Sequence, residues 1–254
     1  VDLIIVSTIS SNVILPCTAC EVQKELGADH ATCFDLSAAC TGFVVAYNTA
    51  AAYLNAGVYQ TALIIGSESL SNLTNWKDRG TCILFGDGAG AAVLKKDDTR
   101  YYLPVTHSNG SRGGALTCKS RYDRSELSLP DLTKPDEKEY LMQMDGREVF
   151  MFAVKSVPQV IREVLEKNDV AQEEIGYYIL HQANKRIVEA IAKRLDEPME
   201  KFPVNLEEYG NTSSASIPIL LDELNREGKL ERGQKIVLAG FGAGLTWGAS
   251  IIEW

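Results

Sequence analysis

A cysteine in a segment suited to thiol chemistry is the first candidate for function in this chain of 254 residues. Cys40 follows a short apolar run and precedes an alanine-rich stretch, 43–54, with apolar residues at helical spacing. We therefore expect Cys40 in the first turn of a buried helix, where the positive end of the helix dipole lowers a thiol pKa. The alternative is that Cys40 is a small buried hydrophobic residue among alanines.

A histidine and an asparagine in the second part of the chain could complement this thiol. His181 directly follows the apolar run 178–180, at the carboxyl end of a predicted strand, where open α/β sheets gather ligands. Asn211 lies in a glycine turn just before a predicted helix. Each also has a structural interpretation, because strand-end histidines are often buried for packing and asparagine often caps a helix.

The elements that would position these residues alternate between predicted strands and predicted helices. This alternation indicates sheets that are parallel in large part. The predicted strands cover residues 3–6, 31–36, 61–65, 82–94, 103–107, 177–180, 235–239 and 246–253. The predicted helices cover residues 16–26, 43–54, 148–167, 184–195 and 214–225. The polar stretch 108–139 is expected to be a surface excursion of the kind that often covers a site.

An internal repeat divides the chain into two halves. The segment 63–67 before 85–93 parallels the segment 236–240 before 241–249, and both read as strand, glycine corner and strand. We place the first half at residues 1–100 and the second at 101–254. The first half is shorter by about 50 residues, roughly one strand and one helix, so we expect an N-terminally truncated first half.

Composition narrows the possible partners. A formal net charge of -9 argues against nucleic acid, and no run approaches the roughly 20 apolar residues that span a bilayer. We expect a cytoplasmic protein without a membrane partner. The motif Cys17-x-x-Cys20 resembles half of a zinc or redox site, but no second pair follows, so no metal is expected.

Six short motifs occur in order along the chain, and as a set they are specific. They are residues 38–43 (AACTGF), 78–81 (DRGT), 85–90 (FGDGAG), 181–184 (HQAN), 210–213 (GNTS) and 241–248 (FGAGLTWG). The chain resembles the β-ketoacyl-acyl-carrier-protein synthase III family, the condensing enzymes that begin bacterial type II fatty acid synthesis. The resemblance runs along the whole chain and lacks the family's N-terminal strand and helix region. It implies a thiolase-like α/β fold in a homodimer, with two duplicated halves, a mixed five-stranded sheet in each and an α-β-α-β-α layering.

The resemblance also implies catalytic roles. Cys40 matches the nucleophile that takes the acyl group from acetyl-CoA. His181 and Asn211 match the pair that hydrogen-bonds the malonyl thioester carbonyl and stabilises the enolate left as carbon dioxide departs. The backbone N–H groups of Cys40 and Ala243 would form the oxyanion hole. The family commonly has glycine where Ala243 stands, and alanine serves if its φ is negative.

Substrate contacts carry over in the same way, and no cofactor is implied. The residues matched to CoA binding are Arg79, Gly146 and Asn184. Those matched to the acyl pocket are Leu70, Phe85 and Leu15, of which Leu15 would reach into the neighbouring subunit's pocket. Those matched to docking of acyl carrier protein are Arg186, Lys193 and Arg194, which without the resemblance read as a solvated helix face.

The function implied is decarboxylative Claisen condensation of a short acyl-CoA, acetyl-CoA first, with malonyl-acyl carrier protein. It would proceed through an acyl-Cys40 intermediate and initiate type II fatty acid synthesis. Two alternatives stay open. One is a related acyltransferase or condensing enzyme of polyketide or secondary metabolism with a different acceptor, and the other is an inactive or scaffolding form.

Overall fold

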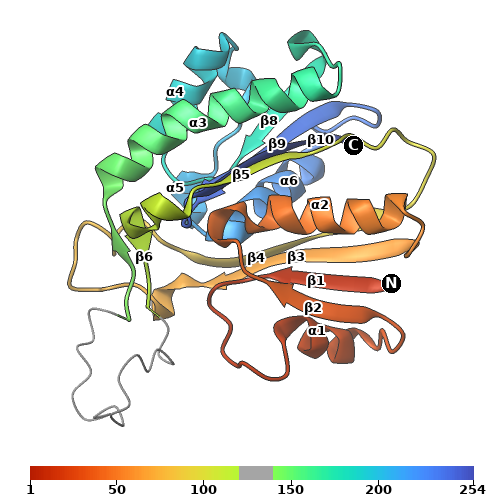
Figure 1. Ribbon diagram of the computed structural model, residues 1–254, viewed down its shortest axis with the longest axis horizontal. Coiled ribbons are helices and arrows are strands. Elements are labelled where there is room, and N and C mark those ends of the chain that lie inside the picture. The colour runs from red at the N-terminus through yellow and green to blue at the C-terminus, as the bar shows by residue number, and fades with distance from the viewer. Residues whose placement is uncertain (120–139) are drawn as a thin grey trace.

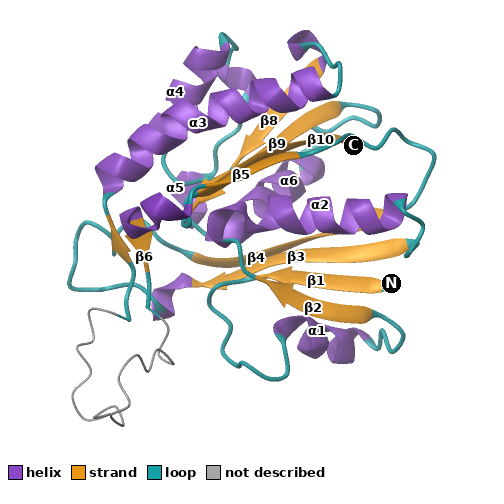
Figure 2. Ribbon diagram, viewed as in Figure 1, coloured by secondary structure: helices purple, strands orange, loops and turns teal. Residues whose placement is uncertain are grey.

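The computed structural model describes residues 1–119 and 140–254, and within them it forms two main sheets of four strands (Figures 1 and 2). Part of the predicted surface excursion, residues 120–139, lies outside the described residues. The strands are β1 (Leu3–Ser7), β2 (Thr32–Leu36), β3 (Thr61–Ser69), β4 (Asp87–Lys95), β5 (Val105–Ser108), β6 (Leu116–Thr117), β7 (Gln143–Met144), β8 (Ile175–Leu180), β9 (Lys235–Gly242) and β10 (Thr246–Glu253).

Six α-helices and several 3-10 turns connect these strands in the described part of the chain. The helices are α1 (Thr18–Leu26), α2 (Gly42–Asn55), α3 (Gly146–Lys167), α4 (Lys185–Leu195), α5 (Leu206–Tyr209) and α6 (Ser216–Arg226). The 3-10 turns are η1 (Ala39–Thr41), η2 (Leu70–Asn72), η3 (Gly110–Ala115), η4 (Gln172–Glu174), η5 (Met199–Lys201) and η6 (Ser213–Ala215). None of the described helices is long and apolar enough to cross a membrane.

The elements stack in five layers, as Figure 1 shows. Helices α3 and α4 cover the outer face of the sheet β5-β10-β9-β8, helices α2 and α6 lie between the sheets, and α1 covers the outer face of the sheet β2-β1-β3-β4. Three apolar clusters fill the spaces between these layers. One lies between the outer helices α3 and α4 and their sheet, one surrounds the central helices, and one lies between α1 and its sheet. The expected α-β-α-β-α order is therefore confirmed.

Strand β1 explains why the sequence opens on an uninterrupted apolar run. It pairs in parallel with both β2 and β3, so it lies inside its sheet. Leu3 and Ile5 pack with the central helices, whereas Ile4 and Val6 pack toward α1. A strand buried on both faces needs apolar residues at every position rather than at alternate ones.

The internal repeat appears as two matching antiparallel hairpins. Strand β3 pairs with β4 so that Gly66 faces Gly90, and β9 pairs with β10 so that Gly240 faces Gly248. In each sheet the first of these strands also has a parallel neighbour, β1 for β3 and β8 for β9. The duplication predicted from the sequence is confirmed, while the boundary near residue 100 stays a prediction.

Each sheet has four strands in the described residues, not the five that we expected. The first half has no counterpart of β5 and α3. The second half has no counterpart of β2, because residues 202–205, which follow α4 and η5, join no ladder. Pro203 has no N–H to donate to a ladder, and the N–H of Asn205 donates to the side chain of Gln182 instead, at 3.3 Å.

Close packing of β3 against η6 gives a stability prediction. A Cβ added at Gly66 would lie 2.3 Å from the backbone carbonyl oxygen of Ser214. Because that oxygen belongs to the backbone, a change of side-chain rotamer cannot relieve the clash. We expect Gly66→Ala to lower the free energy of unfolding by about 2–3 kcal/mol. Gly114→Ala is the control, since nothing lies within 4 Å of its added Cβ. Equal urea midpoints for the two variants would contradict this packing.

Candidate active site

Cys40 lies where the sequence predicted it, in the turn η1 directly before α2, and its residue is only 7% exposed. The preceding Ala39 has a φ of 46°, a left-handed conformation that costs a non-glycine residue energy and is often kept at functional sites. Strand β9 approaches closely from the other side. A Cβ added at Gly242 would lie 2.9 Å from Cβ of Cys40, closer than real Cβ atoms come, so a larger residue there would displace Cys40.

The expected lowering of the Cys40 pKa by the helix terminus was wrong. Burial raises the pKa of the Cys40 thiol to about 12, because the thiolate would lose its hydration. The Ser213 hydroxyl opposes this rise, and the negative charge of Glu68 adds to it. Burial of the sulfur therefore opposes ionisation of the Cys40 thiol.

His181 is fixed at the end of β8 and is 1% exposed. Its backbone N–H donates to the carbonyl of Ala239 at 2.9 Å, and its ring meets the Phe241 ring edge-on with centroids 5.2 Å apart. Burial lowers the pKa of His181 to about 3, so the imidazole is neutral at physiological pH. The predicted position at a strand end is confirmed.

The hydroxyl of Ser216 decides which His181 nitrogen carries the proton. Ser216 Oγ lies 2.8 Å from Nδ1 of His181, accepts from the N–H of Gln182 at 3.3 Å and is 2.9 Å from the carbonyl oxygen of Ser213. If the hydroxyl donates to the Ser213 carbonyl, Nδ1–H donates to Ser216 and Nε2 is an acceptor. If the hydroxyl donates to Nδ1, Nε2 carries the proton and can donate to a substrate.

Asn211 joins the two halves at the site. Its N–H donates to the carbonyl of Leu84 at 2.8 Å, and its carbonyl accepts from the N–H of Gly86 at 3.0 Å, which makes an isolated bridge beside Phe85. Its Oδ1 accepts from the N–H of Ser213 at 2.9 Å. Helix α6 begins only at Ser216, so Asn211 does not cap that helix.

The turn η6 therefore carries the contacts that bring the three candidate residues together. Asn211 accepts a hydrogen bond from the Ser213 N–H, the Ser213 carbonyl lies next to the Ser216–His181 pair, and η6 packs against the turn η1 that holds Cys40. Ser213 itself has a φ of 49°. The sequence placed Cys40, His181 and Asn211 far apart, and the fold collects them around one strained serine.

Ala243 meets the condition set from the sequence. Among the described residues other than glycine, positive φ values occur at Ala39, Asp169, Asp196 and Ser213, and Ala243 is not one of them. It follows Gly242, the residue in contact with Cys40, and its carbonyl accepts from the Thr246 hydroxyl at 3.0 Å. An alanine at position 243 can therefore present its backbone N–H as a donor. The role of this N–H in an oxyanion hole stays a prediction.

A hollow of about 460 Å³ lies beside Asn211 and contains some of the predicted substrate residues. Asn184 and Arg186 line it together with Ile83, Leu84 and Gly210. Asn184 is the N-cap of α4, and its Oδ1 accepts from the N–H of Arg186 at 2.9 Å. This hollow lies between the start of α4 and the turn that holds Asn211, and the three candidate catalytic residues themselves do not line it.

The remaining predicted contacts divide into buried and exposed residues. Leu70 is 1% exposed in η2, directly after β3. Leu15 is 85% exposed, and Arg79 and Gly146 are also exposed; none of these three lines the hollow beside Asn211. A partner subunit or a bound CoA is needed to test them, so their roles stay predictions.

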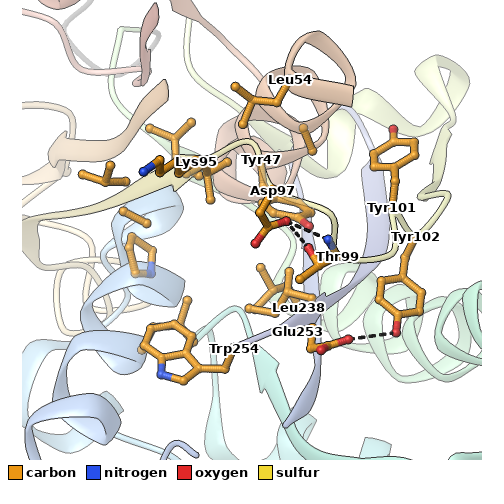
Figure 3. A pocket seen from close by; sticks show the side chains of 18 of the residues that line it. Tyr47, Leu54, Lys95, Asp97, Thr99, Tyr101, Tyr102, Leu238, Glu253 and Trp254 are labelled. Atoms are coloured by element: carbon orange, nitrogen blue, oxygen red, sulfur yellow. Dashed lines mark hydrogen bonds between the residues drawn. The ribbon is translucent and has the colours of Figure 1, made fainter. Parts of the chain in front are cut away.

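A second cavity of about 450 Å³ is not the catalytic site (Figure 3). It lies between α2, β4, α6 and the linker after β4, and Tyr47, Leu54, Asp97 and Trp254 line it. Asp97 accepts from the backbone N–H of Thr99 at its rim. Neither the three candidate catalytic residues nor their immediate neighbours in the chain line this cavity, whereas Gly210, next to Asn211, lines the other hollow.

Several residues that shape the site were missed at the sequence level. Glu68 and Ser216 hold neighbouring groups by hydrogen bonds, Ser213 occupies the centre of the site, and Gly242 admits Cys40. The only signals were an acidic residue inside an otherwise apolar and small strand and a run of serines after Asn211. Neither signal shows which atoms meet.

Comparisons with known proteins agree with this geometry. Two family models match: "3-Oxoacyl-[acyl-carrier-protein (ACP)] synthase III" at residues 34–110 and its C-terminal counterpart at residues 165–254. A β-ketoacyl-[acyl-carrier-protein] synthase III of Clostridium novyi is 47% identical over 254 residues, which cover 100% of this chain and 77% of that protein.

Solved structures give the same result. The 3-oxoacyl-[acyl-carrier-protein] synthase III of Aquifex aeolicus has a TM-score of 0.89 at 42% identity, over 100% of this chain and 77% of that one. The priming β-ketosynthase from the R1128 polyketide biosynthetic pathway has a TM-score of 0.91 at 34% identity, over 100% and 75%.

Fold and site together define a thiolase-like condensing enzyme, that is, an acyltransferase. Within that class, the chain belongs to the 3-oxoacyl-[acyl-carrier-protein] synthase III family.

Proposed function

We propose that this protein condenses a short acyl-CoA with malonyl-acyl carrier protein, releasing carbon dioxide and forming 3-oxoacyl-acyl carrier protein. The observation that carries the proposal is the convergence of Cys40, His181 and Asn211 on the turn η6, which packs against η1 and hydrogen-bonds the other two residues' surroundings. This arrangement suits two successive reactions at one place: acyl transfer to a thiol, and stabilisation of an enolate by neutral donors. The reaction begins fatty acid synthesis and suits a cytoplasmic protein.

In the first half-reaction, Cys40 attacks the thioester carbon of the acyl-CoA and CoA leaves. The backbone N–H groups of Cys40 and Ala243 would hold the negative oxygen that develops. In the second, the malonyl thioester carbonyl accepts hydrogen bonds from Nε2–H of His181 and from the Asn211 amide. This role requires the arrangement in which the Ser216 hydroxyl donates to Nδ1, because only then does Nε2 carry a proton.

The proposed substrates fit the surface around the site. CoA would enter along the hollow that Asn184 lines. Arg79 and Gly146 would contact CoA outside that hollow, and Leu70 and Phe85 would bound the acyl group. Leu15 would contribute to the pocket of a second subunit in a homodimer, which suits its exposed position. The chemistry uses thiol, imidazole, amide and backbone groups, so it needs neither a metal nor an organic cofactor.

The exposed basic residues of α4 suit an acidic carrier protein. Arg186, Lys193 and Arg194 are exposed, and within the described residues no carboxylate forms an ion pair with them, whereas the neighbouring Lys185 pairs with Glu207 at 3.0 Å. Arg186 also lines the hollow beside Asn211, so a docked carrier would lie at its mouth.

We expect Arg186→Glu to raise KM for malonyl-acyl carrier protein by about tenfold, because it places a like charge against the carrier. Because Arg186 also lines the hollow proposed for CoA, Lys193→Glu, which lies outside that hollow, separates the two effects: it should raise the same KM and leave the rate of Cys40 acylation by acetyl-CoA unchanged. Lys24→Glu, on α1, is the matched control and should leave both constants as they are. An Arg186→Glu enzyme with normal KM for the carrier would exclude this docking surface.

A direct assay tests the proposed function. The purified protein is incubated with acetyl-CoA and malonyl-acyl carrier protein, and the carrier is analysed by mass spectrometry. We expect 3-oxobutyryl-acyl carrier protein. The second candidate is a priming synthase of polyketide metabolism, which the 34% identity to the R1128 enzyme favours. A product formed only with longer primers or with another malonyl acceptor would support that candidate.

A further inference from the structure

Two cysteines at the start of α1 lie in contact, and the proposed function does not use them. Sγ of Cys17 lies 3.4 Å from Sγ of Cys20, and both are free thiols. Cys17 is the N-cap of α1, with extended backbone angles, and its side chain makes no capping hydrogen bond. Both residues are partly exposed, whereas Cys40 is buried. The Cys17-x-x-Cys20 motif of the sequence is therefore a pair of neighbouring thiols that solvent can reach.

The fold holds the first turn of α1 in place, and with it the two thiols. The Asp35 carboxylate, on β2, accepts from the backbone N–H groups of Thr18 and Ala19 at 2.8 Å each. These two residues lie between the cysteines in the chain. Ala19 is fully buried, and Cys17 packs against the same apolar cluster. The pair is therefore preorganised, which favours a bond within the pair over a lasting bond to an outside thiol.

The geometry of this turn allows a disulfide bond. The N–H of Cys20 donates to the carbonyl of Cys17 at 3.0 Å, and a turn closed in this way keeps its first and fourth Cα atoms within about 7 Å. A disulfide needs Cα atoms no more than about 7 Å apart. The sulfurs must approach from 3.4 Å to about 2.0 Å, which rotation of the two side chains can supply.

We propose that Cys17 and Cys20 are a redox-active pair that forms a reversible disulfide when the protein meets a low-molecular-weight disulfide such as glutathione disulfide. Cys33, on β2, packs against the same apolar cluster and remains a thiol. The inference is independent of the proposed function. A metal site is the other common use of such a motif, but no group of three or more His, Cys, Asp or Glu side chains in the described residues could hold a metal ion.

Two thiol–disulfide exchanges account for every atom and electron. The Cys17 thiolate attacks one sulfur of the small disulfide, which breaks its S–S bond and leaves a mixed disulfide on Cys17 and one small thiolate. The Cys20 thiolate then attacks the Cys17 sulfur, forms the Cys17–Cys20 bond and expels a second small thiolate. The two protons that the cysteines lose convert the small thiolates to thiols. The protein loses two electrons, and the small disulfide gains them.

The surroundings of the pair decide which thiol reacts first. The hydrogen bond to Cys17 raises the pKa of Cys20, and the negative charge of Asp35 acts in the same direction. Cys20 therefore keeps its proton while Cys17 attacks. Once Cys17 is in a mixed disulfide, it no longer shares a proton with Cys20, so Cys20 can take part in the second exchange.

The same surroundings favour the disulfide over the two thiols. Strongly oxidising pairs of this kind owe their potential to a thiolate that the reduced protein stabilises. In this protein the Asp35 carboxylate already accepts from the N–H groups at the helix terminus, so the positive end of the helix dipole is compensated. We therefore expect a mild oxidant to form the disulfide.

Peptide mass spectrometry distinguishes the possible products. The protein is incubated with glutathione disulfide, its free thiols are blocked with N-ethylmaleimide in urea, and it is cleaved with trypsin without reduction. The tryptic peptide that ends at Lys24 contains both Cys17 and Cys20, whereas peptide 25–77 contains Cys33 and Cys40. We expect the first peptide to lose two hydrogens and to carry no maleimide, and the second to carry two maleimide groups and no glutathione.

Three serine variants locate the bond. Cys33→Ser is the matched control and should form the Cys17–Cys20 disulfide at the wild-type rate. Cys17→Ser and Cys20→Ser should instead keep a glutathione adduct on the remaining cysteine of the pair. That adduct should be lost at least about tenfold more slowly than in the wild type, because no neighbouring thiol can displace the glutathione.

A cross-link between the peptide that ends at Lys24 and peptide 25–77 would place the bond at Cys33 or Cys40 and overturn the assignment. A lasting glutathione adduct in the wild type, or two maleimide groups on the first peptide at every concentration of glutathione disulfide, would exclude a redox-active pair. Dithiothreitol should restore both thiols, and a product that resists it would exclude a reversible disulfide.

Discussion

Replacing Cys40 with alanine is expected to lower acyl transfer from acetyl-CoA, and with it condensation, by a factor of about 10⁴ or more. The sulfur is the atom that bonds the acyl group, and alanine offers no substitute. Little structural disturbance should follow, because Cys40 is small, buried and already in close contact with Gly242. Single-turnover transfer from labelled acetyl-CoA measures the effect.

Cys118→Ala provides a matched control, since Cys118 is exposed and lies outside the site. It should retain wild-type transfer. Substantial transfer by Cys40→Ala, with the label on another residue, would mean that the acyl group follows a different route.

Replacing Asn211 or His181 with alanine should lower decarboxylation of malonyl-acyl carrier protein by about 10² to 10³ while acylation of Cys40 remains measurable. Each side chain would donate to the carbonyl oxygen on which the enolate charge develops. His181 is neutral because burial lowers its pKa to about 3. It therefore does not gain a proton as the pH falls toward 5, and the decarboxylation rate should show no His181 limb near pH 6.5.

Release of labelled carbon dioxide, measured beside acylation of the same variants, separates the two half-reactions. Asn225→Ala, an exposed asparagine on α6, is the control and should affect neither. Loss of acylation with normal decarboxylation would reverse the roles assigned to His181 and Asn211.

The sequence predicted those parts of the fold that depend on local pattern. The apolar run of β1, the hairpin glycines and the helix after Cys40 all follow from periodicity and from glycine placement, and the structure has each of them. Strand pairing was harder to predict. Residues 202–205 join no sheet, because Pro203 lacks a donor and the N–H of Asn205 donates to a side chain.

The candidate site shows a similar division. Cys40 and His181 stand at predictable strand and helix ends, but the surroundings of Glu68 depend on a contact with Ser214, 146 residues away in the chain. The protonation state of Cys40 was also beyond sequence reasoning. A helix terminus favours the thiolate, but burial of the sulfur raises the thiol pKa, and only the fold shows that the sulfur is buried.

The central claim is that Cys40 carries the acyl group. Incubation with isotopically labelled acetyl-CoA, rapid quenching and peptide mass spectrometry test it most directly. We predict a single labelled acetyl thioester on the peptide that contains Cys40, lost when malonyl-acyl carrier protein is added. An unlabelled Cys40 peptide, or a label that resists malonyl-acyl carrier protein, would contradict the account.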